Sequence, residues 1–352
     1  MLIILDGILG SPESDSLVRK VEGFQRLGEV SSLTRLTIPE CETPEAMLIG
    51  LAPEEGQLRQ GPLTVSALGW DPPERSLHFH LSLLSLTDSV RVPKQLLTTD
   101  EFTIVKSKLA VLNTKRLTTL VGQQFDHGLV WERMAEIKTL APAEIVSLNE
   151  SLPEGDGDNE LRRFIDDSVN ILHDEEFNLR RIDNGVDPIN LVWPWGHGYR
   201  LSVPNLALRY GYPYRYESSS FRLAGLVRLA GFKHSEIGRF GTGLQTDFQR
   251  IPYDSGTIVH LDPWLKMRER EEFEEAEYLA AKCGKHLIGR LLDHVLENRL
   301  ELRLVLLGGS AGLGTTFSAT PTESVFPLDE RSLDEPRLPG EQIHELVRRA
   351  LG

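Results

Sequence analysis

The sequence has little cysteine, few aromatic residues and no long apolar run. Cys41 and Cys283 are its only 2 cysteines among 352 residues, too few for a disulfide framework or a thiolate metal site. No segment approaches the roughly 20 consecutive apolar residues that a membrane-spanning helix needs. The N-terminus also lacks the basic region and cleavage site of a signal peptide. We therefore expect a reducing, cytoplasmic compartment and no membrane partner.

Positive charge is scarce as well. Lysine and arginine number 38 against 52 acidic residues, which gives a formal net charge of −14. Because nucleic acid and anionic lipid repel such a surface, neither is an expected partner. The hydrophobic content of 40% and the charged content of 26% are typical of a globular protein. The length suits one large domain or two ordinary ones.

The chain opens with a short apolar run, residues 2–5, that ends in Asp6 and Gly7. An apolar run of this length, closed by a glycine turn, predicts a buried strand of an α/β sheet. A carboxylate just after such a strand lies at the edge where open α/β sheets build their sites. Asp6 is therefore a candidate site residue.

Apolar patterns predict the other elements. The predicted strands are residues 77–86, 103–105, 117–121, 128–131, 189–193, 257–261 and 302–307, and the predicted helices are 16–27, 45–51, 107–112, 160–181, 221–229, 269–298 and 341–351. Their alternation favours a mostly parallel sheet with helices on both faces. The polar stretch 151–159 is typical of a linker. We predict a core domain of residues 1–76 and 150–352, with a smaller α+β cap domain inserted at 77–149.

Six segments resemble, in the same order, motifs of one enzyme family. They are Asp6-Gly7, Gly61-Pro62-Leu63, Phe125 to Val130 (FDHGLV), Asn190 to Gly198 (NLVWPWGHG), Gly225 to Gly231, and Thr246-Asp247. The family is the archaeal-type cofactor-independent, or 2,3-bisphosphoglycerate-independent, phosphoglycerate mutases of the alkaline phosphatase superfamily. The resemblance implies an alkaline-phosphatase-like core and, as substrate, a small phosphorylated metabolite. It also implies two divalent metals, Mn or Zn, which hold a phosphorylated serine for in-line transfer.

The resemblance also shows which groups have changed. Cys41 stands at the position of the nucleophilic serine, and Asp6 and Asp262 are remnants of the metal ligands. Lys266 stands where an imidazole is expected, and Gly308-Gly309-Ser310 replaces an Asp-His pair. With so many ligands changed, no bound cofactor is expected unless the protein is active. An alternative interpretation makes Cys41 an ordinary buried residue.

The substrate-binding side has changed in the same way. Positions of family arginines are occupied by Gln60, His80, Asp126 and Trp195. Each lost charge-assisted contact removes about 1.5–3 kcal/mol of favourable interaction. By the same resemblance, His80, His127, Trp195 and His197 are the predicted lining of a substrate pocket. Core packing is the alternative for the tryptophan-rich segment, and a half-exposed strand face is the alternative to a metal site at His78 and His80.

The sequence is compatible with three functions. The first is a divergent homologue that has lost the dimetal site and acts as a ligand-binding or regulatory protein. The second is an active mutase or related phosphotransferase with rearranged ligands, in which Asp6, Asp262 and a histidine from elsewhere hold one metal. The third is an interaction protein that uses its acidic surface.

Overall fold

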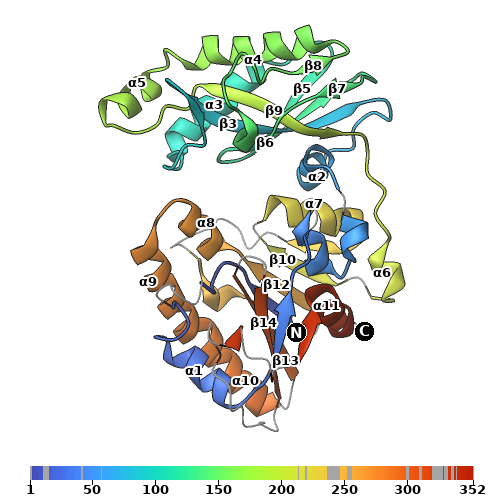
Figure 1. Ribbon diagram of the computed structural model, residues 1–352, viewed down its shortest axis with the longest axis vertical. Helices are drawn as coiled ribbons and strands as arrows, with labels where there is room; N and C mark the ends of the chain where they lie inside the picture. The colour runs from blue at the N-terminus through green and yellow to red at the C-terminus, as the bar shows by residue number, and fades with distance from the viewer. Residues whose placement is uncertain are drawn as a thin grey trace. The chain divides into compact units, whose positions relative to one another are not determined.

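The computed structural model describes residues 2–10, 16–40, 43–56, 58–212, 214–218, 220–235, 246–251, 256–298, 301–308, 311–318, 328, 332–333, 337 and 339–351. The chain divides into two compact units (Figure 1). Met1–Gln57 and Val203–Gly352 form the first, called the core unit here, and Leu58–Ser202 form the second, called the inserted unit. No helix among the described residues is long and apolar enough to cross a membrane.

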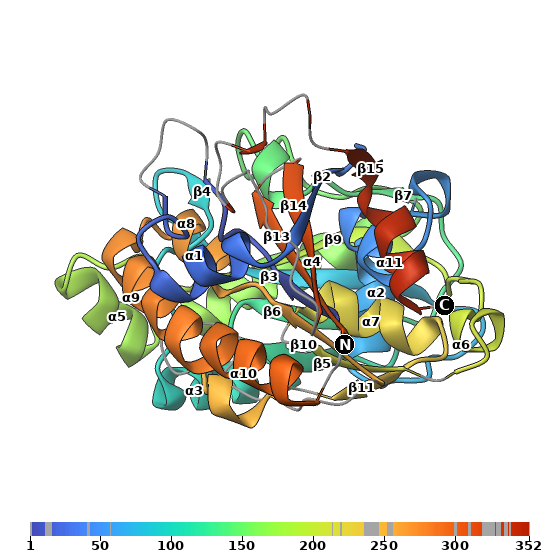
Figure 2. The ribbon, with the colours of Figure 1, turned by 90° about the horizontal axis from the view of Figure 1, so that it is seen from below.

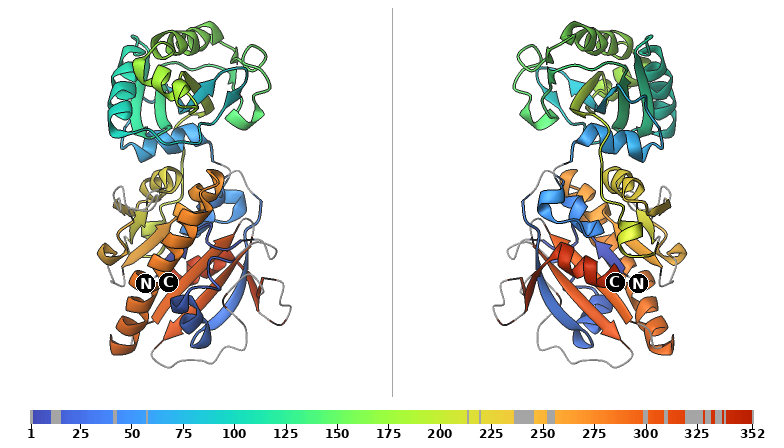
Figure 3. Two further views of the ribbon diagram at one scale, coloured as in Figure 1. Left: turned by 90° about the vertical axis from the view of Figure 1, so that its left-hand side faces the viewer. Right: turned by 90° about the vertical axis from the view of Figure 1, so that its right-hand side faces the viewer.

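The core unit is built on an eight-stranded sheet. Its strands, in spatial order, are β11 (Lys233–Ser235), β10 (Arg215–Ser218), β12 (Thr257–Leu261), β1 (Leu2–Leu5), β13 (Glu301–Gly308), β14 (Ala311–Ser318), β2 (Ser32–Thr37) and β15 (Gly340–Gln342). Only β14 runs antiparallel to its neighbours, and the other described pairings are parallel. The predicted α/β fold with a mostly parallel sheet is confirmed. Figure 3 shows how the N-terminal and C-terminal segments share this unit.

Helices cover both faces of this sheet (Figure 2). The helices are α1 (Glu22–Glu29), η1 (Pro44–Ile49), η2 (Pro53–Gly56), α6 (Leu206–Arg209), α7 (Phe221–Leu229), η5 (Phe248–Arg250), α8 (Pro263–Glu269), α9 (Phe273–Cys283), the π-helical turn η6 (Gly284–Ile288), α10 (Gly289–Asn298) and α11 (Ile343–Leu351). Apolar residues of α1, α8, α9, η6 and α10 form one buried cluster with alternate residues of β1, β12 and β13. On the other face, Leu346 of α11 lies against β14 at Gly314.

The inserted unit contains a five-stranded antiparallel sheet. Its elements are α2 (Gln60–Ala67), β3 (Leu77–Leu86), β4 (Val90–Arg91), α3 (Thr99–Val111), β5 (Leu117–Gln123), β6 (Asp126–Trp131), β7 (Ile137–Lys138), η3 (Pro142–Glu144), β8 (Glu154–Gly155), α4 (Asp158–Leu172), α5 (Glu176–Asp183) and β9 (Leu191–Gly198). The strand order is β4-β3-β6-β5, and β9 pairs with β3. One face packs on α3, α4 and α5, and the other packs on α2.

The inserted unit begins and ends outside the predicted range 77–149. It starts at 58 because α2 packs on β3, and Gly61 lies so close to His78 that a Cβ would come within 2.2 Å of the His78 carbonyl oxygen. It continues to 202 because Leu161 and Phe164 of α4 join the same apolar cluster as β3. The predicted linker 151–159 contains β8 and the first two residues of α4. Asp158 and Glu160, in the first turn of α4, suit the positive end of the helix dipole.

Several local predictions differ from the structure. Residues 103–105 belong to α3, because Thr98 and Glu101 form a capping box that starts the helix at Thr99. The predicted strands leave out residues 311–318, which form β14 and pair with β13 and β2. The helix expected over 160–181 is two helices, since α4 ends at Leu172 and α5 begins at Glu176. The helix expected over 269–298 begins only at Phe273, after the end of α8, and contains the π-helical turn η6.

Candidate functional site at the carboxyl edge of the core sheet

Asp6 lies at the end of β1, in a turn that packs tightly against α8. Its backbone N–H donates to the Leu261 carbonyl oxygen over 2.8 Å. Gly7 follows at φ +76°, and a Cβ there would come within 2.3 Å of the Leu265 backbone nitrogen. Only glycine tolerates both the positive φ and this close approach. The turn therefore fixes the Asp6 carboxylate at the carboxyl edge of the sheet.

His260 of β12 lies beside Asp6. Its Nε2 is 3.5 Å from an Asp6 carboxylate oxygen, and its Nδ1 is 3.0 Å from the Ser218 hydroxyl oxygen. The Ser218 oxygen also accepts the Ser220 backbone N–H over 3.1 Å. The His260 side chain is 2% exposed and that of Asp6 is 21% exposed. Ser218, His260 and Asp6 thus form a line of polar groups across β10, β12 and β1.

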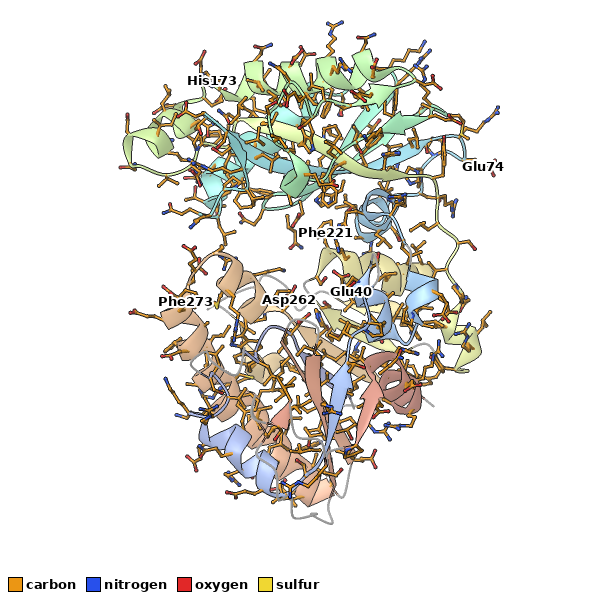
Figure 4. All side chains as sticks on the ribbon, in the orientation of Figure 1. Glu40, Glu74, His173, Phe221, Asp262 and Phe273 are labelled. Atoms are coloured by element: carbon orange, nitrogen blue, oxygen red, sulfur yellow. The ribbon has the colours of Figure 1, made fainter. Side chains whose placement is uncertain are left out.

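Asp262 follows β12 and forms an ion pair with Lys266 of α8. Its Oδ2 lies 3.0 Å from the Lys266 ammonium, one helical turn along α8. The Asp262 side chain is 6% exposed and that of Lys266 is 31% exposed. Figure 4 labels Asp262 and Glu40, which follow β12 and β2 and lie at the same edge of the core sheet. A lysine ammonium thus contacts a buried carboxylate at this edge.

In the inserted unit, His80 of β3 connects a helix to an exposed carboxylate. Its Nδ1 is 2.8 Å from the Thr64 hydroxyl oxygen of α2, and its Nε2 is 3.1 Å from an Asp126 carboxylate oxygen. The Asp126 side chain is 54% exposed. Trp195 meets the His80 ring edge-on at a centroid distance of 5.2 Å and donates its indole N–H to the Ser82 hydroxyl oxygen over 2.9 Å. His80 and Trp195 therefore lie together.

His127 and His197 lie apart from this pair. His127 stacks on Phe102 of α3, and His197 contacts Phe79 and Thr139. Phe79 belongs to the cluster that faces α3 and α4, whereas His80 contacts α2, and successive residues of a strand point to opposite faces. The four predicted pocket residues are thus distributed over two faces of the sheet.

Burial lowers the pKa of several of these histidines. Burial lowers the pKa of His127 to about 4, and burial together with the Arg200 charge lowers that of His78 to about 4. The pKa of His197 is lowered by burial and by Arg59. These three imidazoles are therefore neutral at physiological pH.

Comparison with known proteins finds relatives within one enzyme family. The chain is 22% identical, over 77% of its length, to the 2,3-bisphosphoglycerate-independent phosphoglycerate mutase 2 of Methanothermobacter thermautotrophicus, and it covers 72% of that protein. It is 23% identical to the mutase of Methanothrix thermoacetophila and 22% identical to a probable mutase of Geobacter sulfurreducens. It covers 59% and 49% of these two proteins, which is less than two thirds. No family model matches the chain.

Solved structures show the same fold. A protein from Pyrococcus horikoshii superimposes with a TM-score of 0.67 at 15% identity, over 99% of this chain and 95% of that one. The cofactor-independent phosphoglycerate mutase of Thermoplasma acidophilum gives 0.50 at 14% identity, over 100% and 99%. The chain is a divergent relative of the cofactor-independent phosphoglycerate mutases.

The two metals implied by relationship to these mutases do not fit the described residues. A dimetal site needs several carboxylates and imidazoles directed at shared points. Among the described residues, no group of three or more His, Cys, Asp or Glu side chains is arranged to hold a metal ion. The Lys266 ammonium also places positive charge against the Asp262 carboxylate. Cys41 and Ser310 lie outside the described residues.

The sequence pattern missed His260, the histidine nearest to Asp6. It stands in the run Thr-Ile-Val-His-Leu, where it reads as one polar residue in a buried strand. Its parallel register with β1 pairs His260 with Ile4, which brings its side chain toward the Asp6 turn. The pairing of β1 with β12 identifies His260 as a neighbour of Asp6. These two strands are far apart in the sequence, so the local pattern does not show the contact.

Proposed function

We propose that this chain is a phosphoglycerate-mutase-like protein that has lost the dimetal phosphotransfer site and binds a small phosphorylated metabolite without mutase turnover. Its role is that of a ligand-binding or regulatory protein. The observation that supports this most directly is the Asp262–Lys266 pair, whose ammonium and carboxylate are 3.0 Å apart. An ammonium at this distance competes with a cation for the carboxylate.

The substrate side supports the same proposal. Asp126 places an exposed carboxylate where the family resemblance expects an arginine, and His80 lies 3.1 Å from that carboxylate. A carboxylate repels the anionic groups that an arginine would bind in bidentate fashion. We therefore propose that any phosphorylated ligand binds in a different orientation, with Trp195 of the predicted pocket against its carbon chain. The acidic composition argues against nucleic acid, and a cytoplasmic location remains an expectation.

Metal analysis and enzyme assays test this function together. Protein purified without chelators is analysed for Mn and Zn, assayed for conversion of 3-phosphoglycerate to 2-phosphoglycerate, and titrated with 3-phosphoglycerate by calorimetry. We expect no stoichiometric metal, no turnover and measurable binding. Trp195→Ala weakens this binding, whereas Trp70→Ala, a tryptophan 47% exposed in the same unit, leaves it unchanged. Two bound metals with turnover, or no binding at all, would contradict the proposal.

One observation favours an alternative, an active enzyme with rearranged ligands. The His260 Nε2 lies 3.5 Å from an Asp6 oxygen, and it has no hydrogen-bond partner among the described residues. A carboxylate and an imidazole are suitable ligands for Mn or Zn. This alternative predicts one metal per chain, which Asp6→Asn and His260→Gln would each remove, together with the mutase activity.

A further inference from the structure

The Lys266 ammonium lies 3.0 Å from Asp262, a carboxylate that the family resemblance assigns to metal binding. We propose that the Lys266 ammonium is a built-in counter-ion that takes the role of a divalent cation at Asp262. It makes the carboxyl edge of the core sheet stable without bound metal. This inference rests on the proposed loss of the dimetal site and adds the group that replaces it.

The ion pair has the position that such a replacement requires. Asp262 is the N-cap residue of α8 and Lys266 is four residues further on, so both lie on one side of the helix. The carboxylate is 6% exposed, and a carboxylate removed from water needs a compensating positive charge. The ammonium supplies this charge at 3.0 Å while 31% of its side chain stays exposed.

The pair also differs from a metal site in where its groups come from. A bound metal draws ligands from several strand ends, whereas Asp262 and Lys266 belong to one short segment at the start of α8. The Nε2 atom of the His260 ring lies 3.5 Å from the carboxylate of the neighbouring Asp6. Both predicted metal-ligand remnants therefore contact nitrogen-bearing side chains of the protein. At Asp262 the Lys266 ammonium balances the charge without a bound cation.

The experiment measures melting temperature with MnCl2 and with EDTA. For the wild-type protein, we expect the same melting temperature in both. Lys266→Met leaves Asp262 without the ammonium and lowers the melting temperature by roughly 5 °C, whereas Lys266→Arg keeps the charge and most of the stability. Lys266→His provides an imidazole one helical turn from Asp262, and we expect Mn²⁺ to raise its melting temperature by about 3 °C or more over EDTA. Lys20→Met is the matched control, because the Lys20–Glu277 pair is 58% and 50% exposed.

Several results would overturn the inference. A wild-type protein that Mn²⁺ stabilises or EDTA destabilises already uses a metal. A Lys266→Met protein as stable as wild type shows that the Asp262 carboxylate does not need the Lys266 ammonium as a counter-ion. A folded Lys266→His protein without a Mn²⁺ response shows that position 266 does not replace a cation. If Lys266→Met and Lys266→His both fail to fold, the inference is tested by the melting temperature of the wild-type protein in MnCl2 and in EDTA, and by the stability of Lys266→Arg. The proposed function fails separately, on metal content and turnover of the wild-type protein.

Discussion

Burial of the His127 ring should make the stability of the protein depend on pH below about 6.5. The Nδ1 atom accepts the Gly122 backbone N–H over 3.0 Å, and Nε2 lies 3.0 Å from the Gln124 carbonyl oxygen, to which it donates. The neutral ring thus satisfies both of its nitrogens. Protonation would place a donor at Nδ1 against another donor, in a site where the ring is fully buried.

The magnitude follows from the difference in pKa between the folded and unfolded states. The folded pKa is about 4 and the ordinary value is 6.5. Between these values the unfolded chain binds more protons than the folded one, so stability falls as the pH falls. The full stability is present above pH 6.5, and the loss reaches about 2 kcal/mol at pH 5 and about 3 kcal/mol at pH 4.

Urea unfolding at pH 7 and pH 5, followed by tryptophan fluorescence, measures this loss. His127→Phe keeps the stacking on Phe102 and removes the titrating group. We expect this variant to be less stable than wild type at pH 7, by about 1–2 kcal/mol for the lost hydrogen bonds. The difference should shrink by about 2 kcal/mol at pH 5. His173→Gln, at a side chain 60% exposed, should keep the wild-type pH dependence. An unchanged difference between His127→Phe and wild type would refute the reasoning.

Three further predictions concern buried positions. Gly7→Ala places a Cβ within 2.3 Å of the α8 backbone at φ +76°, and urea unfolding should show a loss of about 2 kcal/mol or more; an unchanged stability would contradict the described turn. Asn178→Leu leaves the Ile189 backbone, which bonds to both ends of the amide, without partners, and we expect a loss of about 2–4 kcal/mol in the same assay. Burial raises the pKa of the Cys283 thiol well above its ordinary range, so in a Cys41→Ser variant a thiol reagent should label the native protein far more slowly than the urea-unfolded one.

Short apolar runs were the most predictable part of the fold. The strand at 2–5, the strand at 77–86 and the strand at 257–261 agree with β1, β3 and β12 residue for residue. Their composition alone marks them as buried, because few other conformations hide so many apolar side chains in so few residues. Asp6 at the end of β1 followed directly from the first of these.

The predictions that failed depended on contacts between distant segments. The strand β14 is rich in glycine, and it forms because β13 and β2 pair with both of its edges. In a regular strand Trp195 and His197, two residues apart, would share a face. The register of β9 against β3 shifts between Trp195 and Gly198, and Gly196 adopts φ +60°, so His197 contacts Phe79 instead of the His80 side. His127 stacks on Phe102 of α3. The functional role of Cys41 stays a prediction, since that residue lies outside the described part of the chain.

The pairing of β1 has a consequence for how the protein folds. Leu2 pairs with Ile258 on one side and with Arg303 on the other, so the first strand acquires its partners only after most of the chain has been synthesised. Such non-local pairing slows folding. The inserted unit, by contrast, is one continuous segment, Leu58–Ser202, and all of its strand partners have been made by then. During translation we therefore expect the inserted unit to fold first. The apolar strand β1 remains unpaired until β12 and β13 have been synthesised, and in that time it is accessible to chaperones.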